Sequence, residues 1–496
     1  MVQTPTRQTT ATELATLAID LIRQAGCEYG DVRFCTYRKQ VLFARDRSLS
    51  RLADNDNSGF GIRVLLNGAW GFAASHRKTP EEVTRVVQLA VEIARGSRLC
   101  QQIPIQLVPV EAYQDSYTTP IATNPFEIPV GKKADLLLDW NERLLSYEDQ
   151  GIKKASSYLL FSQEDKLFAS TVGSLINQTL YRSYGGYNCT AIANGDAQQR
   201  GYERPPLNIG YEHIDAADFY AQIDRVAQEA IEKVHAPKGP FGIESTLILK
   251  PTNVWLTIHE SVGHPTELDR VYGYESNFAG TSFATTDKLK TLQYAAPWVS
   301  FKCDRTQANG RSTMAYDDEG VPAQDWYVVK DGILVDYLTD RETAYRLGRG
   351  SSNGCAFADS WSSVPMVRIP NLGLEPGPAG GSHTATLEEM IADTEDGILI
   401  DGIGSFSIDQ QRRNFQFGGD AFWQVKNGKV VGMLKDVTYH SMTTDFWNKV
   451  DAIGPASEQL QCGTNMCGKG EPIQIAQMTH AAVPVRVRDI HIGGAK

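Results

Sequence analysis

The chain has 496 residues, enough for two to four domains, and its 42% hydrophobic and 22% charged residues are typical of a soluble globular protein. The net charge of −11 disfavours non-specific binding to nucleic acid, because phosphates would be repelled. Residues 1–6 lack the pattern of a signal peptide, and no run approaches the ~18 apolar residues of a membrane helix. Eight cysteines without framework spacing favour reduced thiols, so we expect a cytoplasmic protein with no membrane or nucleic-acid partner.

The first hundred residues predict two helices on either side of a group of strands. Thr10 and Glu13 have the spacing of a capping box, and the apolar face that follows predicts a helix ending at Gly26. A second helix is expected from Thr79-Pro80, since proline is favoured at the first helical position. Between the helices we expect strands over 32–37, 41–44, 61–66 and 69–74. Asn67-Gly68 is typical of a type I′ hairpin turn between the last two strands.

A proline-rich connection over 104–129 leads into further helices and strands. We expect a helix over 132–147, several strands between 153 and 193, and a helix over 217–234. The segment 236–240, Ala-Pro-Lys-Gly-Pro, is the strongest linker pattern in the chain. It predicts a boundary between a mixed α/β N-terminal domain at 1–236 and a second domain at 240–496.

The second domain is expected to consist mainly of strands and turns. A strand over 245–250 precedes a helix over 252–263, and a short helix is expected over 387–392. Asp331-Gly332 and Asn427-Gly428 predict two hairpins. The sequence therefore predicts an α+β fold whose C-terminal domain is dominated by antiparallel β-sheet.

The helix over 252–263 carries the pattern His-Glu-x-x-x-His, from His259 to His264. In the familiar zinc motif the two histidines are four residues apart and share one helix face. Five residues on a regular α-helix leave the side chains ~140° apart, too far around the axis to meet at one ion. We expect the helix to end near Gly263, with His264 turning back because Pro265 disfavours the α conformation before it. A π-bulge around 261–262 is the alternative solution.

Glu260 directly follows the first histidine, which is the position of a general base in helical zinc sites. A glutamate there lies beside the activated water and can accept its proton. A catalytic zinc site also needs a third protein ligand and an open position. The glycine-rich tail 462–470 offers Cys462 and Cys467 as candidate thiolate ligands. The competing interpretation is that these histidines, the glutamate and the cysteines are ordinary structural residues.

The other polar clusters are interpreted as structural. The acidic run 317–319 precedes Gly320 and favours a turn over a cation site. Glu267 and Asp269 are taken as surface or structural residues rather than as partners of a ligand histidine. No role is assigned to His383, His440, His480, His491 or Cys355.

Several segments resemble the TldD/PmbA family of metallopeptidases. Residues 259–283, which read HESVGHPTELDRVYGYESNFAGTSF, are similar to the family signature. Further segments that agree with the family are 61–72, 316–320, 467–470 and the glycine pair 493–494. Residues 265–270 differ from the best-known members, so substrate contacts are not carried over.

The resemblance implies that His259, His264 and Cys467 bind Zn²⁺ and that Glu260 acts as the base. Because the inactive paralogue of the family lacks the histidine motif, this chain resembles the catalytic, TldD-like member. The resemblance also implies short or unfolded peptides as substrates. It further implies a dimer, formed either with the motif-lacking paralogue or with a second copy of this chain.

Two other functions stay open from the sequence. The first is a non-catalytic binding or regulatory protein that acts on a protein partner, since an acidic chain is not prevented from binding protein. The second is hydrolysis of a different amide by the same site. A zinc measurement separates the first of these from the peptidase.

Overall fold

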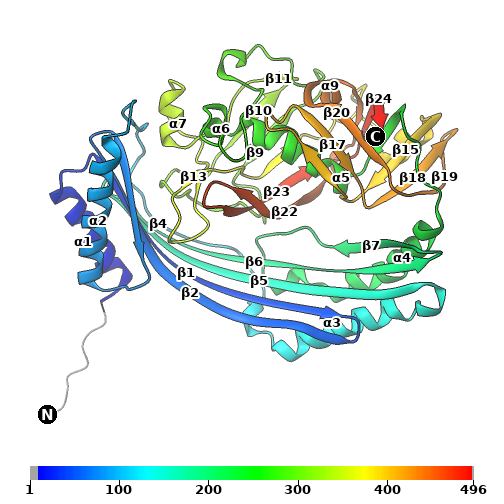
Figure 1. Ribbon diagram of the computed structural model, residues 1–496, viewed down its shortest axis with the longest axis horizontal. Helices are drawn as coiled ribbons and strands as arrows, with labels where there is room; N and C mark the ends of the chain where they lie inside the picture. Colours follow the sequence, from blue (N-terminus) through cyan, green and yellow to red (C-terminus); the bar gives the residue numbers. More distant parts are fainter. Residues whose placement is uncertain (1–8, 494–496) are drawn as a thin grey trace.

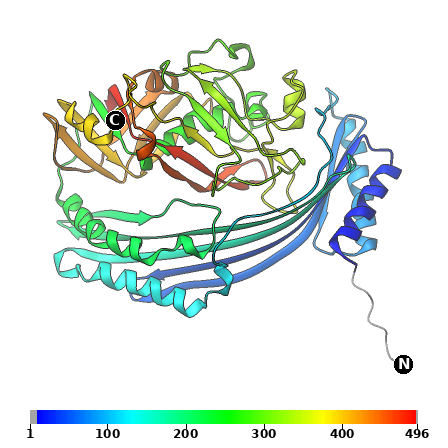
Figure 2. The same cartoon turned by 180° about the vertical axis from the view of Figure 1, so that it is seen from behind.

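The N-terminal half of the chain forms one long curved sheet, and the C-terminal half packs into its concave side (Figures 1 and 2). The structure is a computed structural model that describes residues 9–493. Residues 1–6 and Gly494, which entered the expectations above, lie outside the described part. Below, the curved sheet means β1 to β7, and the C-terminal body means residues 243–493.

The curved sheet has seven strands, in the order β3-β2-β1-β5-β6-β4, with β7 also pairing with β6. All neighbours are antiparallel except β4 and β6. The strands are β1 Tyr29–Arg45, β2 Ser48–Leu66, β3 Ala69–Ser75, β4 Gln114–Thr118, β5 Ile152–Ser170, β6 Leu175–Ala193 and β7 Asp196–Glu203.

Two strands of this sheet are longer than the sequence predicts. β1 runs without a break through the polar residues that separate the expected strands 32–37 and 41–44. The first half of β2, Ser48 to Gly59, was not predicted as a strand because its sequence is polar and its side chains are mostly exposed. Continuous pairing with β1 forms it, helped by Arg38, which donates to Asp54 at 3.0 and 2.9 Å across the two strands.

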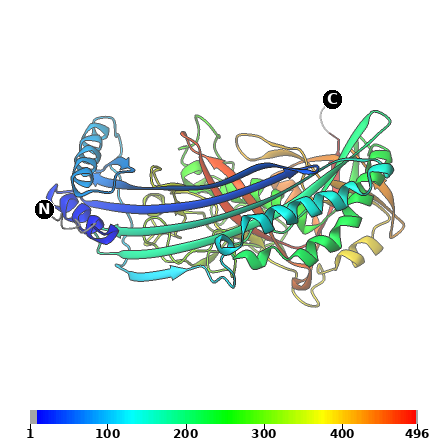
Figure 3. The ribbon, with the colours of Figure 1, turned by 90° about the horizontal axis from the view of Figure 1, so that it is seen from below.

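Four helices cover the convex face of the curved sheet, in two pairs (Figures 1 and 3). The pair α1 (Ala11–Gln24) and α2 (Pro80–Arg98) shares one apolar cluster with β1, β2 and β5 at one end. The pair α3 (Val130–Leu145) and α4 (Ala216–His235) shares another with β1, β5 and β6 at the other end. The predicted caps are present at both first helices, where Thr10 and Thr79 accept backbone N–H groups.

The concave face of the curved sheet is charged, because successive side chains of a strand point to opposite faces. In β5, Phe161 packs among the helices, whereas Glu164 and Lys166 face the C-terminal body. The acidic run 317–319 docks there: Lys166 donates to Asp318 at 2.7 Å, and Arg63 donates to Glu319 at 3.1 Å. The predicted acidic turn is confirmed, and the structure shows that it joins the two halves of the molecule through buried ion pairs.

The C-terminal body is built on a nine-stranded mixed sheet, in which β8 and β15 are the parallel pair. Its strands are β8 Ile243–Leu249, β15 Asp396–Asp401, β16 Phe406–Ile408, β17 Asn414–Gly418, β18 Ala421–Lys426, β19 Lys429–Leu434, β20 Thr438–Met442, β21 Val450–Ile453 and β24 Val485–Ile492. Beside it lie a four-stranded sheet and two hairpins: β9 Phe301–Asp304, β10 Asp325–Lys330, β11 Ile333–Leu334 and β14 Leu372–Leu374; β12 Ala356–Phe357 with β13 Met366–Val367; and β22 Leu460–Lys469 with β23 Gln474–Ala482. The helices are α5 Pro251–Ile258, α6 Leu268–Val271, α7 Arg341–Arg346, α8 Leu387–Ala392 and α9 Thr443–Asn448.

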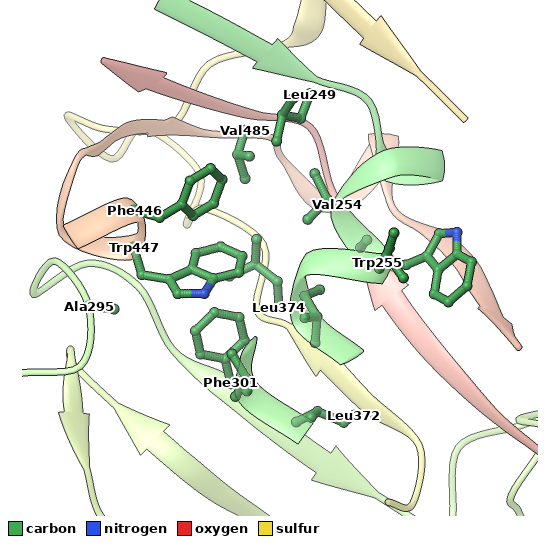
Figure 4. Packing of buried hydrophobic residues seen from close by; sticks show 14 of the residues in the cluster. Leu249, Val254, Trp255, Ala295, Phe301, Leu372, Leu374, Phe446, Trp447 and Val485 are labelled. Carbon is green, nitrogen blue, oxygen red and sulfur yellow. The ribbon is translucent and has the colours of Figure 1, made fainter. Parts of the chain in front are cut away.

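The core of the C-terminal body fixes α5 in place. Figure 4 shows Val254 of α5 near Phe446 and Trp447 of α9, with Phe301 of β9 below them. These residues belong to one large apolar cluster, so α5 is held by burial on most of its surface. The motif that follows α5 therefore begins from a rigid element.

Most predicted elements of the two halves are confirmed. The turns at Asn67-Gly68, Asp331-Gly332 and Asn427-Gly428 all have positive φ at both residues, as a type I′ hairpin requires. The short helix over 387–392 and the α+β class are also confirmed. The domain division at 236–240 falls where the chain passes from α4 to β8 and stays a prediction. Within the described residues, no helix combines the length and apolarity needed to cross a membrane.

Replacing Asp318 with alanine is expected to lower the free energy of unfolding by about 3–5 kcal/mol, because it removes the closer of the two carboxylates that pair with the buried, charged Lys166. Urea denaturation followed by tryptophan fluorescence measures the loss. The control is Glu142→Ala, whose partner Arg47 is 57% exposed and for which we expect a loss below about 1 kcal/mol. Equal losses in the two variants would contradict the structural role of the acidic turn.

Candidate metal centre

The two histidines of the motif are brought to one side of the chain by a π-helical turn. α5 ends at Ile258, and His259 to Gly263 form the π-helical turn that follows. The backbone N–H of His264 donates to the carbonyl of His259, which is an i→i+5 hydrogen bond. One turn of backbone therefore contains five residues at this point, and the two imidazole centroids lie 4.7 Å apart.

The expectation of a broken helix end is wrong, and the alternative of a π-bulge is the one observed. Gly263 and His264 both have right-handed helical dihedrals, with φ of −60° and −62°. The constraint of Pro265 on the preceding residue is overridden by the surrounding packing. Gly263 is needed for space rather than for an unusual backbone, because a Cβ there would lie 2.7 Å from Cδ1 of Ile369.

Side chains satisfy the backbone groups that the π-helical turn leaves without helical partners. Pro265 has no N–H to donate to the carbonyl of Ser261, and the Tyr294 hydroxyl donates to that carbonyl instead. Trp447 Nε1 donates to Ser261 Oγ at 2.8 Å, and Thr266 Oγ1 donates to the carbonyl of Val262 at 2.8 Å. The turn is buried and hydrogen-bonded, so it is a defined structural element.

The third expected ligand lies beside the two histidines. Cys467 comes from β22, where an irregular register between Thr464 and Cys467 interrupts the pairing with β23. Cys467 Sγ lies 3.5 Å from His264 Nε2, and one ligand atom from each of His259, His264 and Cys467 lies within 4.8 Å of the others. No other group of three such side chains meets that criterion within residues 9–493. Cys462, the rival candidate on the same strand, stays outside this group.

A chain of hydrogen bonds sets which nitrogen of His259 faces Cys467. His480 Nδ1 lies 2.8 Å from the carbonyl of Leu372, which can only accept, so this nitrogen carries the proton. Burial lowers the pKa of His480 well below its usual value, so the ring is neutral and its Nε2 is an acceptor. His259 Nδ1, 2.8 Å away, must then be the donor, and His259 Nε2 keeps a free lone pair.

A carboxylate orients the second histidine in the same way. Glu267 Oε2 accepts from His264 Nδ1 at 2.8 Å, which leaves His264 Nε2 as the free nitrogen beside Cys467. Lys469 Nζ lies 3.3 Å from Glu267 and donates to Asp269 at 2.7 Å. The surface interpretation of Glu267 and Asp269 is therefore wrong, since both are buried beneath the ligands.

The environment shifts the pKa values of the ligand side chains and of Glu267 in different directions from what burial alone would give for the acids. Burial lowers the pKa of both His259 and His264 from their ordinary value. Burial also acts to raise the pKa of Cys467, but the charge and the hydrogen bond of His264 outweigh it and hold that pKa below its usual value. Burial opposes the ionisation of Glu267 too, yet Lys469 and His264 hold its pKa well below the ordinary range.

Glu260, the expected base, lies in the same turn and has a cationic partner. Arg412 Nη1 donates to Glu260 Oε2 at 2.7 Å, and the side chains are 15% and 8% exposed. Arg412 comes from the turn between β16 and β17 and has a positive φ of 62°. The ion pair fixes the carboxylate beside the first histidine.

The donor set fits a zinc ion. Two imidazole nitrogens and one thiolate are preferred zinc ligands, and three protein ligands leave a fourth position open, as in catalytic sites. Tetrahedral bonds of ordinary length would place the sulfur and a nitrogen about 3.6 Å apart. The observed 3.5 Å between Cys467 Sγ and His264 Nε2 agrees with that separation.

Sequence analysis missed three residues of this site: His480, Arg412 and Lys469. The only sequence signal for His480 was that a histidine follows soon after the candidate cysteines, in a segment that can pair with theirs. Register decides its role, because Cys462 and His480 are opposite each other in the β22–β23 hairpin. Arg412 carried no signal beyond a pair of arginines in a turn.

Comparison with known sequences identifies relatives along the whole chain. Sequence models of PmbA/TldA metallopeptidases match domain 1 at residues 30–94, the central domain at 123–236 and the C-terminal domain at 244–494. A protein of Methanocaldococcus jannaschii named a metalloprotease is 27% identical, over 89% of this chain and 92% of that protein. Another so named, from Methanothermobacter thermautotrophicus, is 26% identical over 94% and 96%. A relative from Saccharolobus solfataricus, 22% identical over 95% and 98%, is named a zinc metalloprotease TldD homolog.

Solved structures share the fold. A Thermotoga maritima protein, described as a modulator of a DNA gyrase, superposes with a TM-score of 0.77 at 17% identity, over 98% of this chain and all of that chain. TldE from Thermococcus kodakarensis superposes with a TM-score of 0.72 at 14% identity, over 96% and 100%. At these identities the likeness shows the architecture alone.

In metal-free protein, the Cys467 thiol is expected to ionise at a lower pH than an ordinary cysteine, because His264 stabilises the thiolate. Its folded-state pKa lies below the unfolded value, so this contribution to stability is complete at alkaline pH and is lost as the pH falls through the folded pKa. Ultraviolet thiolate absorbance, measured as the difference between the natural chain and Cys467→Ser, follows the titration. A Cys467-dependent signal that appears only above the pH of a free thiol would contradict this.

Proposed function

This chain belongs to the PmbA/TldA metallopeptidase family, and from that premise we propose that it is a zinc-dependent peptidase acting on short or unfolded peptides. In the proposal, His259, His264 and Cys467 hold Zn²⁺. Glu260 is the general base. The observation that carries the proposal is the convergence of two imidazoles and one cysteine sulfur, with the carboxylate of Glu260 held by Arg412 in the same turn.

Zinc bound there would supply Lewis acidity, which activates a water and polarises an amide carbonyl. Glu260 accepts the proton of the attacking water on its carboxylate and delivers it to the nitrogen of the leaving amine. Arg412 holds the carboxylate in position through the bond at 2.7 Å. His480 and Glu267 keep the two ligand rings oriented with Nε2 inward.

The burial of the site supports extended peptides, rather than folded proteins, as substrates. His259, His264 and Cys467 are each only 4% exposed, so an amide bond in a folded protein could not approach them. An extended peptide can enter where a globular surface cannot.

The name of the Saccharolobus solfataricus relative supports zinc as the metal. The proposal includes a dimer, with a second copy or with a motif-lacking paralogue, and the shared fold with TldE supports the second choice.

Purified protein is expected to contain about one zinc per chain, because three protein ligands and an open position complete a catalytic site. Cys467→Ser should lose the metal, whereas Glu260→Gln should retain it and lose peptide cleavage, since glutamine cannot accept the proton. Metal analysis and cleavage of short unstructured peptides measure the two effects.

The matched control is Cys462→Ser, which changes a buried cysteine of the same strand outside the ligand group and should keep zinc. Zinc-free natural protein, or full activity in Glu260→Gln, would favour a non-catalytic regulatory protein. Cleavage of small amides but not of peptides would favour the other hydrolase.

Glu267→Gln is expected to weaken zinc binding about 10- to 100-fold, because the charged acceptor behind His264 is lost. Competition with a chromogenic chelator measures the affinity. Glu275→Gln provides the comparison. Glu275 is a buried carboxylate whose side chain accepts a hydrogen bond from the backbone N–H of Gly470 and, within the described residues, is hydrogen-bonded to no ligand histidine. If the two variants weaken zinc equally, the role of Glu267 is not that of an orienting partner.

A further inference from the structure

A cavity of about 200 Å³ lies between the concave face of the curved sheet and the C-terminal body. Four arginines line it: Arg182 of β6, Arg305, Arg311 and Arg368. Figure 1 shows the β22–β23 hairpin on the side of the C-terminal body that faces β5 and β6, and residues 475–477 of β23 form part of the wall. The proposed chemistry does not use this cavity.

The wall of the cavity has more positive than negative charge. With Lys39 there are five cationic side chains and two carboxylates, Glu164 and Asp359. Glu164 is already shared by Arg182 at 2.9 Å and Lys166 at 3.1 Å. Asp359 accepts from Ser363 Oγ and from the backbone N–H of Ile475. A chain with a net charge of −11 thus has a local excess of positive charge around this cavity.

Three of the arginines have no carboxylate partner within hydrogen-bond distance in the described structure. Arg311 donates to the carbonyl of Leu207, Arg305 to that of Gly354, and Arg368 to those of Cys467 and Gln474. Carbonyls satisfy some of the five donors of a guanidinium but none of its charge. An uncompensated buried charge is costly, so a ligand that supplies the opposite charge would be bound strongly.

Each of the four guanidinium groups also has a free donor. The Nε atoms of Arg182, Arg305, Arg311 and Arg368 are buried and have no hydrogen-bond partner among the described residues. Exposure of these residues ranges from 2% to 8%. Burial and the neighbouring Arg182 lower the pKa of Arg311 well below its usual value, which shows how poorly its charge is compensated.

The cavity adjoins the metal centre through shared residues. Arg368 donates to the backbone carbonyl of Cys467, so the same side chain lines the cavity and supports the ligand strand. Ile369, also in the wall, contacts the motif at Gly263. Ala476 lines the cavity and lies opposite Cys467 in the hairpin.

We propose that this cavity binds a carboxylate of the peptide substrate, either its C-terminal carboxylate or an acidic side chain. The proposal rests on the peptidase function proposed above. Guanidinium groups bind carboxylates through paired, charge-assisted hydrogen bonds, and four of them around one cavity suit such a ligand. The volume is large enough for a carboxylate-bearing residue in place of several waters. A substrate anchored here would present a nearby amide bond to the metal centre.

The test measures binding to the full-length Glu260→Gln chain, in which turnover is removed, by isothermal titration calorimetry. The probes are acetyl-tetraalanine with a free C-terminus, the same peptide as its amide, and the amide with one alanine replaced by glutamate. We expect at least tenfold tighter binding of one or both carboxylate peptides than of the neutral amide. Preference for the free C-terminus identifies that group as the ligand, and preference for the glutamate peptide identifies an acidic side chain.

Arg311→Met, in the same background, should reduce the preference at least tenfold and leave binding of the amide unchanged. Arg225→Met removes the same charge from the exposed face of α4, outside the cavity, and should keep the preference. Arg182→Gln provides a second cavity variant if Arg311→Met fails to fold, and the comparison of probes on the unmodified background needs neither.

Equal binding of all three peptides would overturn the proposal, as would a preference that survives both cavity variants. Inorganic phosphate that binds in an Arg311-dependent way without displacing the carboxylate peptides would also overturn it, and would assign the cavity to a free anion. Zinc content is measured on the same samples. If the proposed peptidase function is wrong, the samples contain no zinc. If only the carboxylate proposal is wrong, the samples contain zinc but bind the three peptides equally.

Discussion

The backbone hydrogen bond from His264 N–H to the carbonyl of His259 is the constraint on which the metal centre depends. It inserts one residue into a helical turn, so that a five-residue spacing has the effect that a four-residue spacing has on a regular helix. Without it, the two rings would be on different sides of α5, and Cys467 could reach only one of them. The extra residue is tolerated because Tyr294 and Thr266 donate to backbone carbonyls of the irregular turn, while Trp447 holds the side chain of Ser261.

Behind the ligands, the protein accepts the cost of buried charge to fix ring orientation. Glu267 and Lys469 have fully buried side chains, and Asp269 is only slightly exposed, so the two carboxylates depend on the positive charge of Lys469 for compensation. Such networks contribute little net stability but allow few alternative arrangements. The ring of His259 is oriented without a charged partner, through hydrogen bonds that run from His259 to His480 and from His480 to the carbonyl of Leu372. The two histidines therefore have the same inward Nε2 for different physical reasons.

Buried ion pairs are also found where the two halves of the molecule meet. The convex face of the curved sheet is closed by apolar helices, while its concave face holds the C-terminal body through ion pairs of Lys166 and Arg63. Directional contacts of this kind define how the ligand hairpin β22–β23 is placed above the sheet (Figure 1). Between the halves there is also the arginine-lined cavity, whose wall has five cationic side chains and two carboxylates.

Local chemistry determined much of this protein from its sequence. Capping residues, the Asn-Gly and Asp-Gly turns, and the spacing of His259, Glu260 and His264 indicated the first two helices, the hairpins and the two motif histidines, because each signal acts over a few residues. The first half of β2 could not be predicted from the sequence, since its polar residues form a strand only by pairing with β1. The π-helical turn was one of two local solutions, and the hydrogen bonds of Tyr294 and Trp447 to Ser261 favour it over a broken helix end. His480, Lys469 and Arg412 acquired their places only through tertiary structure, because strand register and chain return bring together residues that no sequence spacing relates.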